Sequence, residues 1–325
     1  MSAFLIVDDL HVRFSDSNGR AVHALNGVNL HVRAGEALGV LGESGSGKST
    51  LAKGLLRILP RNAEIPRGTI TFEGRNLLQL SEKVMNELRG ARLAMIPQEP
   101  GLSLNPVMKV GDQITDVLRA HRTWDAHRRR VRAEDILQRL LPGTAGRSMY
   151  DAYPHQLSGG QQQRVVIAQA LACEPALIVA DEPTAALDAA TEGEILEVFR
   201  KLKAERRRSL ILITHDPTIL RELTDRVAVM YAGRVVEQGP THQILTHPRH
   251  PYVQGLLACI LPQDGLRVPG RKLRTIAGSP PDPRGTASGC NFFPRCSERI
   301  EKCEFAHPGA QGTPVDTHVE CFLYE

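Results

Sequence analysis

The chain has 325 residues, of which 42% are hydrophobic and 23% charged, and its formal net charge is +4. This size suits one large α/β domain with an appendage, and so small a charge does not indicate a nucleic-acid-binding protein. No apolar run reaches the roughly 18 residues of a membrane-spanning helix, and the first residues are too polar for a signal peptide. The composition therefore predicts a cytosolic chain with reduced thiols, in which six cysteines need another explanation.

The first part of the chain carries a phosphate-binding pattern. Strand-like segments at 4–14 and 24–35 predict an antiparallel pair, and the apolar segment 36–41 then leads into a glycine-rich loop and a helix at 49–59. This loop satisfies G-x-x-x-x-G-K-[ST], in which glycines let backbone N–H groups converge on phosphates, the lysine reaches the β- and γ-phosphates, and the Ser hydroxyl ligates Mg²⁺. The predicted nucleotide-binding residues are Gly42, Glu43, Ser44, Gly45, Ser46, Gly47, Lys48, Ser49 and Thr50.

The middle of the chain, from about residue 90 to 156, has a helical pattern. Residues 110–121 and 126–141 are amphipathic candidates, and the basic run 127–132 is expected to be a solvated helix face rather than a nucleic-acid patch.

A second glycine turn then opens a helix at 161–173. Ser158 is placed to cap this helix, and the turn formed with Gly159 and Gly160 suits an anion. Since one nucleotide needs only one cradle, we expect two chains to pair head to tail, so that each turn closes over the nucleotide of the other chain.

Two buried strands are predicted at 176–180 and 209–214, and polar side chains follow each of them. The carboxyl ends of strands in an open α/β sheet are where ligands bind. Asp181 is therefore expected to hold Mg²⁺, Glu182 to act as general base on the attacking water, and His215 to contact the γ-phosphate. Residues 226–239 then predict a β-hairpin.

The order of these motifs, with "LSGGQ" at 157–161, "LIVADEP" at 177–183 and "ITH" at 213–215, resembles the nucleotide-binding subunit of an ATP-binding cassette (ABC) transporter over residues 4–240. The resemblance implies an α/β fold: a P-loop NTPase (RecA-like) core, an antiparallel β subdomain and a helical subdomain that carries the signature. It also implies two ATP molecules between two cassettes, with Leu157, Ser158, Gly159, Gly160 and Gln161 acting on the partner's ATP.

The same resemblance implies further roles. Gln98 in "MIPQEP" matches the glutamine that contacts Mg²⁺ and couples the site to membrane subunits, and Leu187 and Asp188 match the loop that reaches the opposite site. Phe14 matches the aromatic residue that stacks on adenine, although Tyr is commoner there. From the residues alone, Gln98 could be a solvated loop residue and Phe14 a core residue.

Beyond residue 240 the chain changes character, so we expect an ATPase domain at 1–240 and a C-terminal extension at 241–325. "HPY" at 250–252 and "GCNFFPRC" at 289–296 resemble the oligopeptide/dipeptide importer ATPases. This resemblance implies a second, non-identical ATPase subunit, two transmembrane permeases, an extracytoplasmic solute-binding protein, no nucleic acid, and a peripheral position on the cytoplasmic face of the inner membrane. Alternatives are an importer for nickel or another small solute, and a soluble ABC ATPase acting on nucleic acid or ribosomes.

Four cysteines, Cys290, Cys296, Cys303 and Cys321, lie in this extension. Their spacing is not the paired knuckle of structural zinc, and loop cysteines beside aromatic residues suit a thiolate-ligated cluster. The subfamily resemblance implies a [4Fe–4S] cluster, while zinc or unligated thiols remain alternatives, as does a mixed site with His307 or His318. Cys173 and Cys259 are expected in the core.

Overall fold

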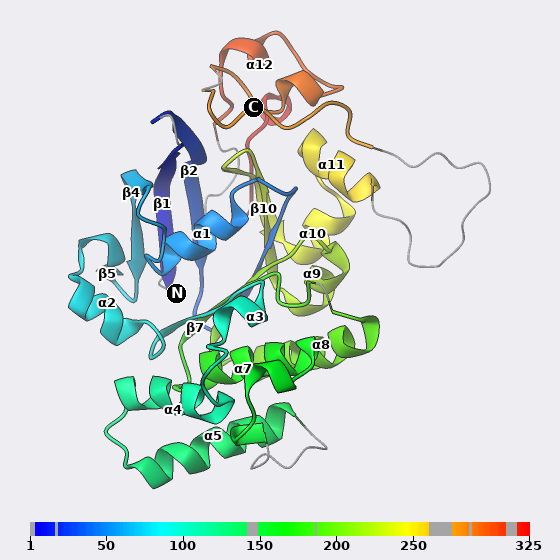
Figure 1. The fold of residues 1–325 in the computed structure, drawn as a ribbon. Coiled ribbons are helices and arrows are strands. Elements are labelled where there is room, and N and C mark those ends of the chain that lie inside the picture. Colours follow the sequence, from blue (N-terminus) through cyan, green and yellow to red (C-terminus); the bar gives the residue numbers. More distant parts are fainter. Residues whose placement is uncertain are drawn as a thin grey trace. The chain divides into compact units, whose positions relative to one another are not determined.

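The computed structural model describes residues 4–16, 19–141, 149–185, 187–259, 275–285, 288–309 and 317–325. The chain divides into two compact units, and Figure 1 labels many of their elements. The helical unit comprises Arg33–Ala37 and Asn76–Ile213, and the phosphate-loop unit comprises Ser2–Val32, Leu38–Arg75 and Thr214–Glu325. Within the described ranges, no helix combines the length and the apolar character needed to cross a bilayer.

An antiparallel sheet begins the phosphate-loop unit. Strand β1 (Leu5–Ser15) pairs with β2 (Ala21–Val32) on one side and with β4 (Ala63–Phe72) on the other, and β5 (Arg75–Asn76) follows β4 after a turn. Buried residues alternate with more exposed ones at the start of β1, as expected when one face of a sheet covers a core. The antiparallel pair predicted from the sequence is confirmed.

A second group of strands surrounds the end of the phosphate loop. Strand β3 (Ala37–Leu41) runs parallel to β9 (Arg226–Tyr231), and β9 forms a hairpin with β10 (Arg234–Pro240). The predicted hairpin is confirmed: Ala232 and Gly233 make its two-residue turn with φ of 46° and 78°. Two left-handed residues match the twist of the flanking strands, which explains the short connection.

The helices of this unit follow their sequence signals. Helix α1 spans Lys48–Leu55, directly after the glycine loop. Asp216 caps α9 (Pro217–Leu223) by accepting a hydrogen bond from the Thr218 N–H. The remaining helices and single-turn helices are α10 (Thr241–Thr246), α11 (Pro251–Ala258), η3 (Phe293–Arg295), α12 (Lys302–Phe305) and η4 (Phe322–Tyr324).

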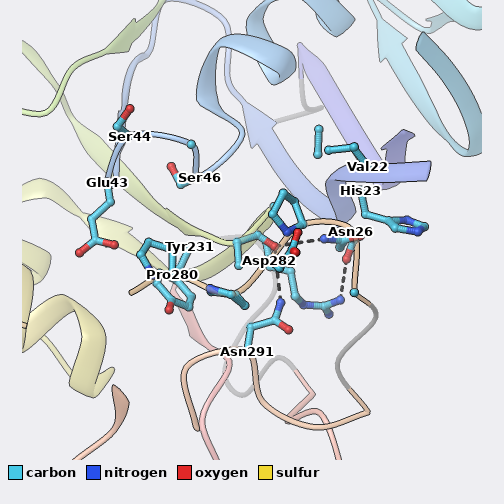
Figure 2. A pocket seen from close by; sticks show the side chains of 18 of the residues that line it. Val22, His23, Asn26, Glu43, Ser44, Ser46, Tyr231, Pro280, Asp282 and Asn291 are labelled. Atoms are coloured by element: carbon cyan, nitrogen blue, oxygen red, sulfur yellow. Dashed lines mark hydrogen bonds between the residues drawn. The ribbon is translucent and has the colours of Figure 1, made fainter. Parts of the chain in front are cut away.

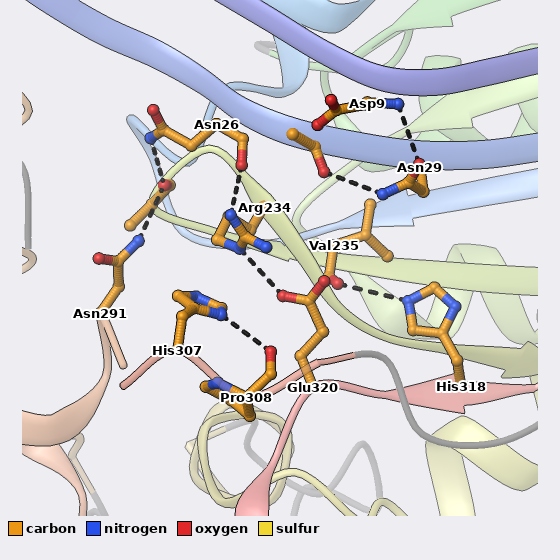
Figure 3. Close-up of polar contacts among 12 residues, drawn as sticks. Asp9, Asn26, Asn29, Arg234, Val235, Asn291, His307, Pro308, His318 and Glu320 are labelled. Atoms are coloured by element: carbon orange, nitrogen blue, oxygen red, sulfur yellow. Dashed lines mark hydrogen bonds and ion pairs between the residues drawn. The ribbon is translucent and has the colours of Figure 1, made fainter. Parts of the chain in front are cut away.

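The C-terminal region is tied to β10 by buried polar contacts. Strand β11 (His318–Val319) pairs antiparallel with β10, and the Arg234 Nε donates to Glu320 at 3.0 Å (Figure 3). The Glu237 carboxylate, also on β10, accepts the backbone N–H groups of Arg249 at 2.9 Å and His250 at 2.8 Å. These bonds satisfy the carboxylate within the fold, so the start of α11 is fixed to the strand.

The helical unit contains three parallel strands in the order β8-β7-β6. Strands β7 (Leu177–Asp181) and β8 (Ser209–Ile213) are buried at every position, in agreement with their continuous apolar sequence. Strand β6 (Leu93–Ile96) falls inside the stretch that the sequence indicated to be helical from about residue 90. The short run "LAMI" is too brief for its apolar pattern to distinguish strand from helix, and pairing with β7 decides it.

The other elements that the structure describes in this unit are helices. The two predicted helices are confirmed as α4 (Val110–His121) and α5 (Ala126–Leu140). They pack against each other and on α7 (Gly159–Leu171), the helix that the signature turn opens (Figure 1). The others are η1 (Leu77–Gln79), α2 (Glu82–Leu88), α3 (Pro100–Ser103), η2 (Pro154–Gln156) and α8 (Ala189–Glu205). Cys173 is buried as expected, whereas Cys259, in the other unit, is only half-buried.

Candidate functional site

The glycine loop joins β3 to α1 and has the backbone of an anion cradle. Gly42, Gly45 and Gly47 have φ of 157°, 78° and 103°, values that L side chains rarely adopt. A Cβ on Gly47 would lie 2.6 Å from the Ala24 carbonyl oxygen, and one on Gly42 would overlap the Met230 carbonyl oxygen. Gly42 and Gly47 therefore require glycine because neighbouring backbone leaves no room for a side chain, whereas Gly45 favours glycine through its backbone conformation alone.

Lys48 lies folded within this loop. The residue is 8% exposed, and its Nζ donates to the carbonyl oxygens of Gly42 at 2.8 Å and Glu43 at 2.9 Å. Ser46 is buried, while Ser44 and Gly45 are exposed, and Ser49 and Thr50 are half-buried in the first turn of α1. An ammonium at the mouth of a helix N-terminus is the arrangement expected for phosphate binding.

A cavity of about 730 Å³ adjoins the loop, and its walls come from four parts of the phosphate-loop unit (Figure 2). Phe14 and the β2 residues Val22 to Asn26 form one wall, and the loop residues from Glu43 to Ser46 form another. The turn between β9 and β10 and the C-terminal residues Pro280 to Asp282, Asn291 and His307 complete it. This volume lies in the range of small-molecule sites. Phe14 thus lines the cavity beside the loop, as the base-stacking prediction requires.

Asp181 and Glu182 lie in the helical unit, at the end of β7. Asp181 is buried and Glu182 is half-buried. Glu182 has a left-handed backbone with φ of 48°, and its N–H donates to the Ile213 carbonyl of β8 at 2.9 Å. A non-glycine residue in this conformation stores strain that the surrounding hydrogen bonds must hold, and such residues gather at functional sites.

The signature turn caps α7 as predicted. The Ser158 Oγ accepts the Gln161 N–H at 3.3 Å, and the Gln161 side chain accepts the Ser158 N–H at 3.0 Å, which makes a complete capping box. Ser158 and Gly159 are exposed, Leu157 and Gln161 are half-buried, and Gly160 is buried against Thr191. The turn is therefore open to a ligand at its first two residues and packed at the third.

The remaining predicted positions lie wholly or partly at the surface. Gln98 is exposed between β6 and α3, and Leu102 and Val107, shortly after it, are 82% and 80% exposed. Asp188 caps α8 by accepting the Thr191 N–H at 3.0 Å and its hydroxyl at 2.8 Å, and these bonds hold the pKa of the Asp188 carboxyl below its usual range. Leu187 is half-buried and His215 is exposed.

The predicted site residues are thus divided between the two units. Phe14, the loop with Lys48, and His215 belong to the phosphate-loop unit. Gln98, Asp181, Glu182, the signature turn and Asp188 belong to the helical unit, and each set has the local geometry described above. Their catalytic roles stay predictions.

The four late cysteines are free thiols that line one small cavity of about 20 Å³ together with Phe292 and Phe322. Burial, with a smaller effect of neighbouring thiols, raises the pKa of Cys290 to about 11, so this sulfur is held as a thiol. Among the residues that the structure describes, no group of three or more His, Cys, Asp or Glu side chains is arranged as a metal site. The geometry therefore gives no support to the expected iron–sulfur cluster.

Two contacts at the loop were not foreseen. Arg295 forms a bidentate ion pair with Glu43, at 2.8 and 3.1 Å, and the Glu43 N–H donates to the Tyr252 hydroxyl at 3.0 Å. Arg295 and Tyr252, the two partners of Glu43, both lie beyond residue 240. In the sequence they stand out only because Tyr252 belongs to the "HPY" motif and Arg295 directly precedes Cys296.

Two protein-family models match this chain. The model described as "ABC transporter" covers residues 25–185, and the model described as "Oligopeptide/dipeptide transporter, C-terminal region" covers residues 236–303. The second model includes Tyr252 and Arg295, and three of the four late cysteines.

Curated relatives match almost the full chain. The oligopeptide transport ATP-binding protein OppD of Escherichia coli is 42% identical over 96% of this chain and 91% of its own length. OppD of Haemophilus influenzae is 41% identical over 94% and 93%, and the dipeptide transport ATP-binding protein DppD of Bacillus subtilis is 39% identical over 100% and 96%.

Solved structures agree with these matches. The ATP-binding cassette MJ0796, in a dimeric post-hydrolysis state bound to ADP and Pi, has a TM-score of 0.65 and 27% identity, and covers 73% of this chain and 98% of that one. The protein cbiO1 of Clostridium perfringens, part of the ABC transporter complex cbiONQ, has a TM-score of 0.63 and 30% identity over 76% and 92%. With its phosphate loop, signature turn and C-terminal region, this chain belongs to the ABC transporter family of ATP-binding proteins, in the oligopeptide/dipeptide branch.

Proposed function

We propose that this chain is the ATP-binding and ATP-hydrolysing subunit of an ABC importer that takes up dipeptides or oligopeptides through partner membrane permeases. The observation that carries this proposal is the joint presence, in one chain, of the ABC cassette at 25–185 and the oligopeptide/dipeptide transporter region at 236–303. ATPase activity is general for this family, and the relatives named above transport oligopeptides or dipeptides.

In this proposal, the phosphate loop binds the triphosphate. Backbone N–H groups of the loop converge on the phosphates, and Lys48 exchanges its two carbonyl partners for phosphate oxygens. Phe14 stacks on the base within the adjoining cavity. Mg²⁺ would be held by three oxygen donors: the hydroxyl of Ser49, the side-chain amide of Gln98 and the carboxylate of Asp181. Mg²⁺ prefers oxygen ligands, and when bound it would neutralise phosphate charge.

Glu182 and His215 are assigned to hydrolysis. The carboxylate of Glu182 accepts a proton from the attacking water, and the imidazole of His215 contacts the γ-phosphate. Leu157, Ser158, Gly159, Gly160 and Gln161 act on the ATP of a second cassette, and the loop of Leu187 and Asp188 touches the opposite site. The open Ser158–Gly159 end of the turn supports this assignment, because it leaves the helix N-terminus free for an anion.

A pair of variants tests these roles. Glu182→Gln should lower ATP turnover by about 10²- to 10⁴-fold while ATP affinity is kept, as expected when a general base is removed. Lys48→Ala should instead weaken ATP binding itself, and Glu197→Gln, an exposed pair partner on α8, is the matched control that should change neither. Near-normal turnover of Glu182→Gln would contradict the base assignment.

The assembly and location follow from the same proposal. We infer that the chain works with a second, non-identical cassette subunit, two permeases and an extracytoplasmic solute-binding protein, as a peripheral protein on the cytoplasmic face of the membrane. Its ATPase domain would span 1–240 and its C-terminal extension 241–325. Reconstitution with the permeases should give ATP-dependent uptake of labelled dipeptide; uptake of nickel in its place would move the chain to another cargo class.

The four late cysteines are inferred to ligate an iron–sulfur cluster. This inference comes from the subfamily resemblance; in the described residues Cys290, Cys296, Cys303 and Cys321 line one cavity but are not grouped as a metal site. Anaerobically purified protein should then be coloured and contain iron and sulfide. Colourless protein with stoichiometric zinc would favour the zinc alternative, and metal-free protein would exclude both.

A further inference from the structure

Arg295 joins the C-terminal region to the phosphate loop. Its guanidinium makes two bonds to the Glu43 carboxylate, at 2.8 and 3.1 Å, and its Nε donates to the Ala277 carbonyl at 3.0 Å. The Tyr231 hydroxyl accepts a further bond at 3.3 Å. The Arg295 side chain is only 5% exposed, and the Glu43 carboxylate raises the pKa of this guanidinium further above its usual range. Buried bidentate pairs of this kind fix geometry as well as charge.

Glu43 is restrained by hydrogen bonds at three of its groups. Its carboxylate binds Arg295, its N–H donates to the Tyr252 hydroxyl at 3.0 Å, and its carbonyl accepts a bond from Lys48 at 2.9 Å. Figure 2 shows Glu43 beside Ser44 and Ser46 at the edge of the cavity. Two of the three restraints come from the C-terminal region, so the conformation of the loop at Glu43 depends on where that region lies.

The turn that carries Arg295 also connects two of the cysteines. In η3, the Phe293 N–H donates to the Cys290 carbonyl at 2.9 Å, and the Cys296 N–H donates to the Phe293 carbonyl at 3.3 Å. Arg295 therefore lies among the five residues between Cys290 and Cys296, whose side chains both line the small cavity of the four cysteines. A change in the separation or orientation of these two cysteines moves η3 and, with it, the guanidinium.

An aromatic cluster supports the same connection. Phe292, which lines the small cavity of the four cysteines, packs edge-on against Tyr231 and Tyr252 with ring centroids 5.3 and 5.5 Å apart. Tyr231 accepts the bond from Arg295, and Tyr252 accepts the bond from Glu43. Close-packed rings transmit displacement because they leave no free volume to absorb it.

We propose that Arg295 is a positioning residue for nucleotide binding: it holds the phosphate loop through Glu43 and couples ATP affinity to the arrangement of the four-cysteine loops. The inference rests on the proposed function, since it takes the loop to be the ATP site. Coupling between two sites is reciprocal, so bound ATP must also change the arrangement of the loops that carry the four cysteines.

The first experiment measures ATP affinity with a fluorescent ATP analogue. Arg295→Gln should weaken ATP binding by about 5-fold or more, which is the lower end of the range for coupling between two sites. Arg295→Lys keeps the positive charge but not the bidentate guanidinium, so it should weaken ATP binding less. Glu43→Gln should match Arg295→Gln, and the double variant should be no worse than either. Arg299→Gln, four residues further on and exposed over Phe293, is the matched control and should bind as the unmodified chain does.

The second experiment tests the coupling to the cysteines. In metal-free full-length protein, saturating ATP should slow the reaction of Cys290, Cys296, Cys303 and Cys321 with maleimide by about 5-fold, and this protection should vanish in Arg295→Gln. Cys296→Ser should weaken ATP binding in the unmodified background but not add to Arg295→Gln. Equal alkylation rates with and without ATP, or additive losses of affinity, would overturn the coupling.

The outcomes separate this inference from the proposed function. If Lys48→Ala binds ATP as tightly as the unmodified chain, the assignment of the ATP site itself fails. If Lys48→Ala binds weakly while Arg295→Gln binds normally, the ATP site stands and the positioning role of Arg295 alone is wrong. Circular dichroism and the thermal unfolding midpoint show whether each variant is folded, and affinities are compared per folded protein.

Discussion

The two glycines of the signature turn differ in their surroundings, and this difference gives a sharp prediction. A Cβ on Gly159 would meet no heavy atom within 4 Å, whereas a Cβ on Gly160 would overlap the Thr191 Cγ2 atom and lie 3.3 Å from the Thr191 Cβ and Oγ1. Thr191 cannot turn away freely, because its hydroxyl donates to Asp188 at 2.8 Å. Gly160→Ala therefore requires either a backbone shift or the loss of that bond.

The expected cost follows from these contacts. Overpacking by one methyl group costs about 1–3 kcal/mol, and the gain of a helical alanine over glycine offsets up to about 1 kcal/mol. Gly160→Ala should thus lower the free energy of unfolding by about 1–2 kcal/mol, while Gly159→Ala should leave it unchanged or raise it by up to about 1 kcal/mol. Gly159→Ala should nevertheless reduce ATP turnover, because the added methyl group lies on the open face that is proposed to meet the partner's triphosphate.

Urea unfolding followed by circular dichroism measures the stability of both variants. A double variant provides the decisive control: Thr191→Ser removes Cγ2 but keeps the hydroxyl that binds Asp188, so it should restore most of the stability lost in Gly160→Ala. Equal unfolding midpoints for the two alanine variants, or no recovery in Gly160→Ala/Thr191→Ser, would refute the packing argument.

Further predictions concern the phosphate-loop unit. Glu237→Ala removes the acceptor of the Arg249 and His250 N–H groups and should lower the free energy of unfolding by about 2–4 kcal/mol; a thermal midpoint equal to that of the unmodified chain would contradict this. Burial holds the pKa of His318 below its ordinary value, so the unfolded chain takes up the proton first and the free energy of unfolding should fall as pH drops from about 7 to about 5. Urea unfolding at several pH values measures this dependence, and His318→Asn should make the free energy of unfolding depend less on pH. An unchanged pH dependence in that variant would show that other groups cause it. Phe14→Ala should weaken ATP binding by about 2- to 10-fold, whereas Phe14→Tyr should keep it; equal affinities for all three would make Phe14 a packing residue only.

The local sequence pattern was sufficient to predict the strands and the helix cap that position the site. The apolar runs at 36–41, 176–180 and 209–214 each became a buried parallel strand, and Ser158 caps α7 as its type and place indicated. Strand β6 was not separable from a helix, because four apolar residues carry no period of their own. Its pairing with β7 is a tertiary contact that neighbouring sequence does not encode.

Long-range side-chain pairs lay beyond sequence reasoning for a different reason. Glu43 and Arg295 are separated by 252 positions, and nothing in the residues around either one specifies the other as its partner. The same holds for Arg234 with Glu320 and for Glu237 with the backbone at 249–250. Such pairs become visible only when the fold brings distant segments to one place, and here they link the C-terminal region to the phosphate loop through Glu43 and to β10 through Arg234 and Glu237.

The position of β11 has a consequence for how this protein is made. Glu237 and Gln238 of β10 pair with Val319 and His318, about 80 positions further along, so a growing chain exposes this hydrogen-bonding edge of β10 until β11 has been synthesised. Open edges recruit strands from other molecules, which makes incompletely synthesised chains prone to aggregation. A nonsense or frameshift change between β10 and β11 should therefore favour aggregation, because it leaves this edge of β10 uncovered.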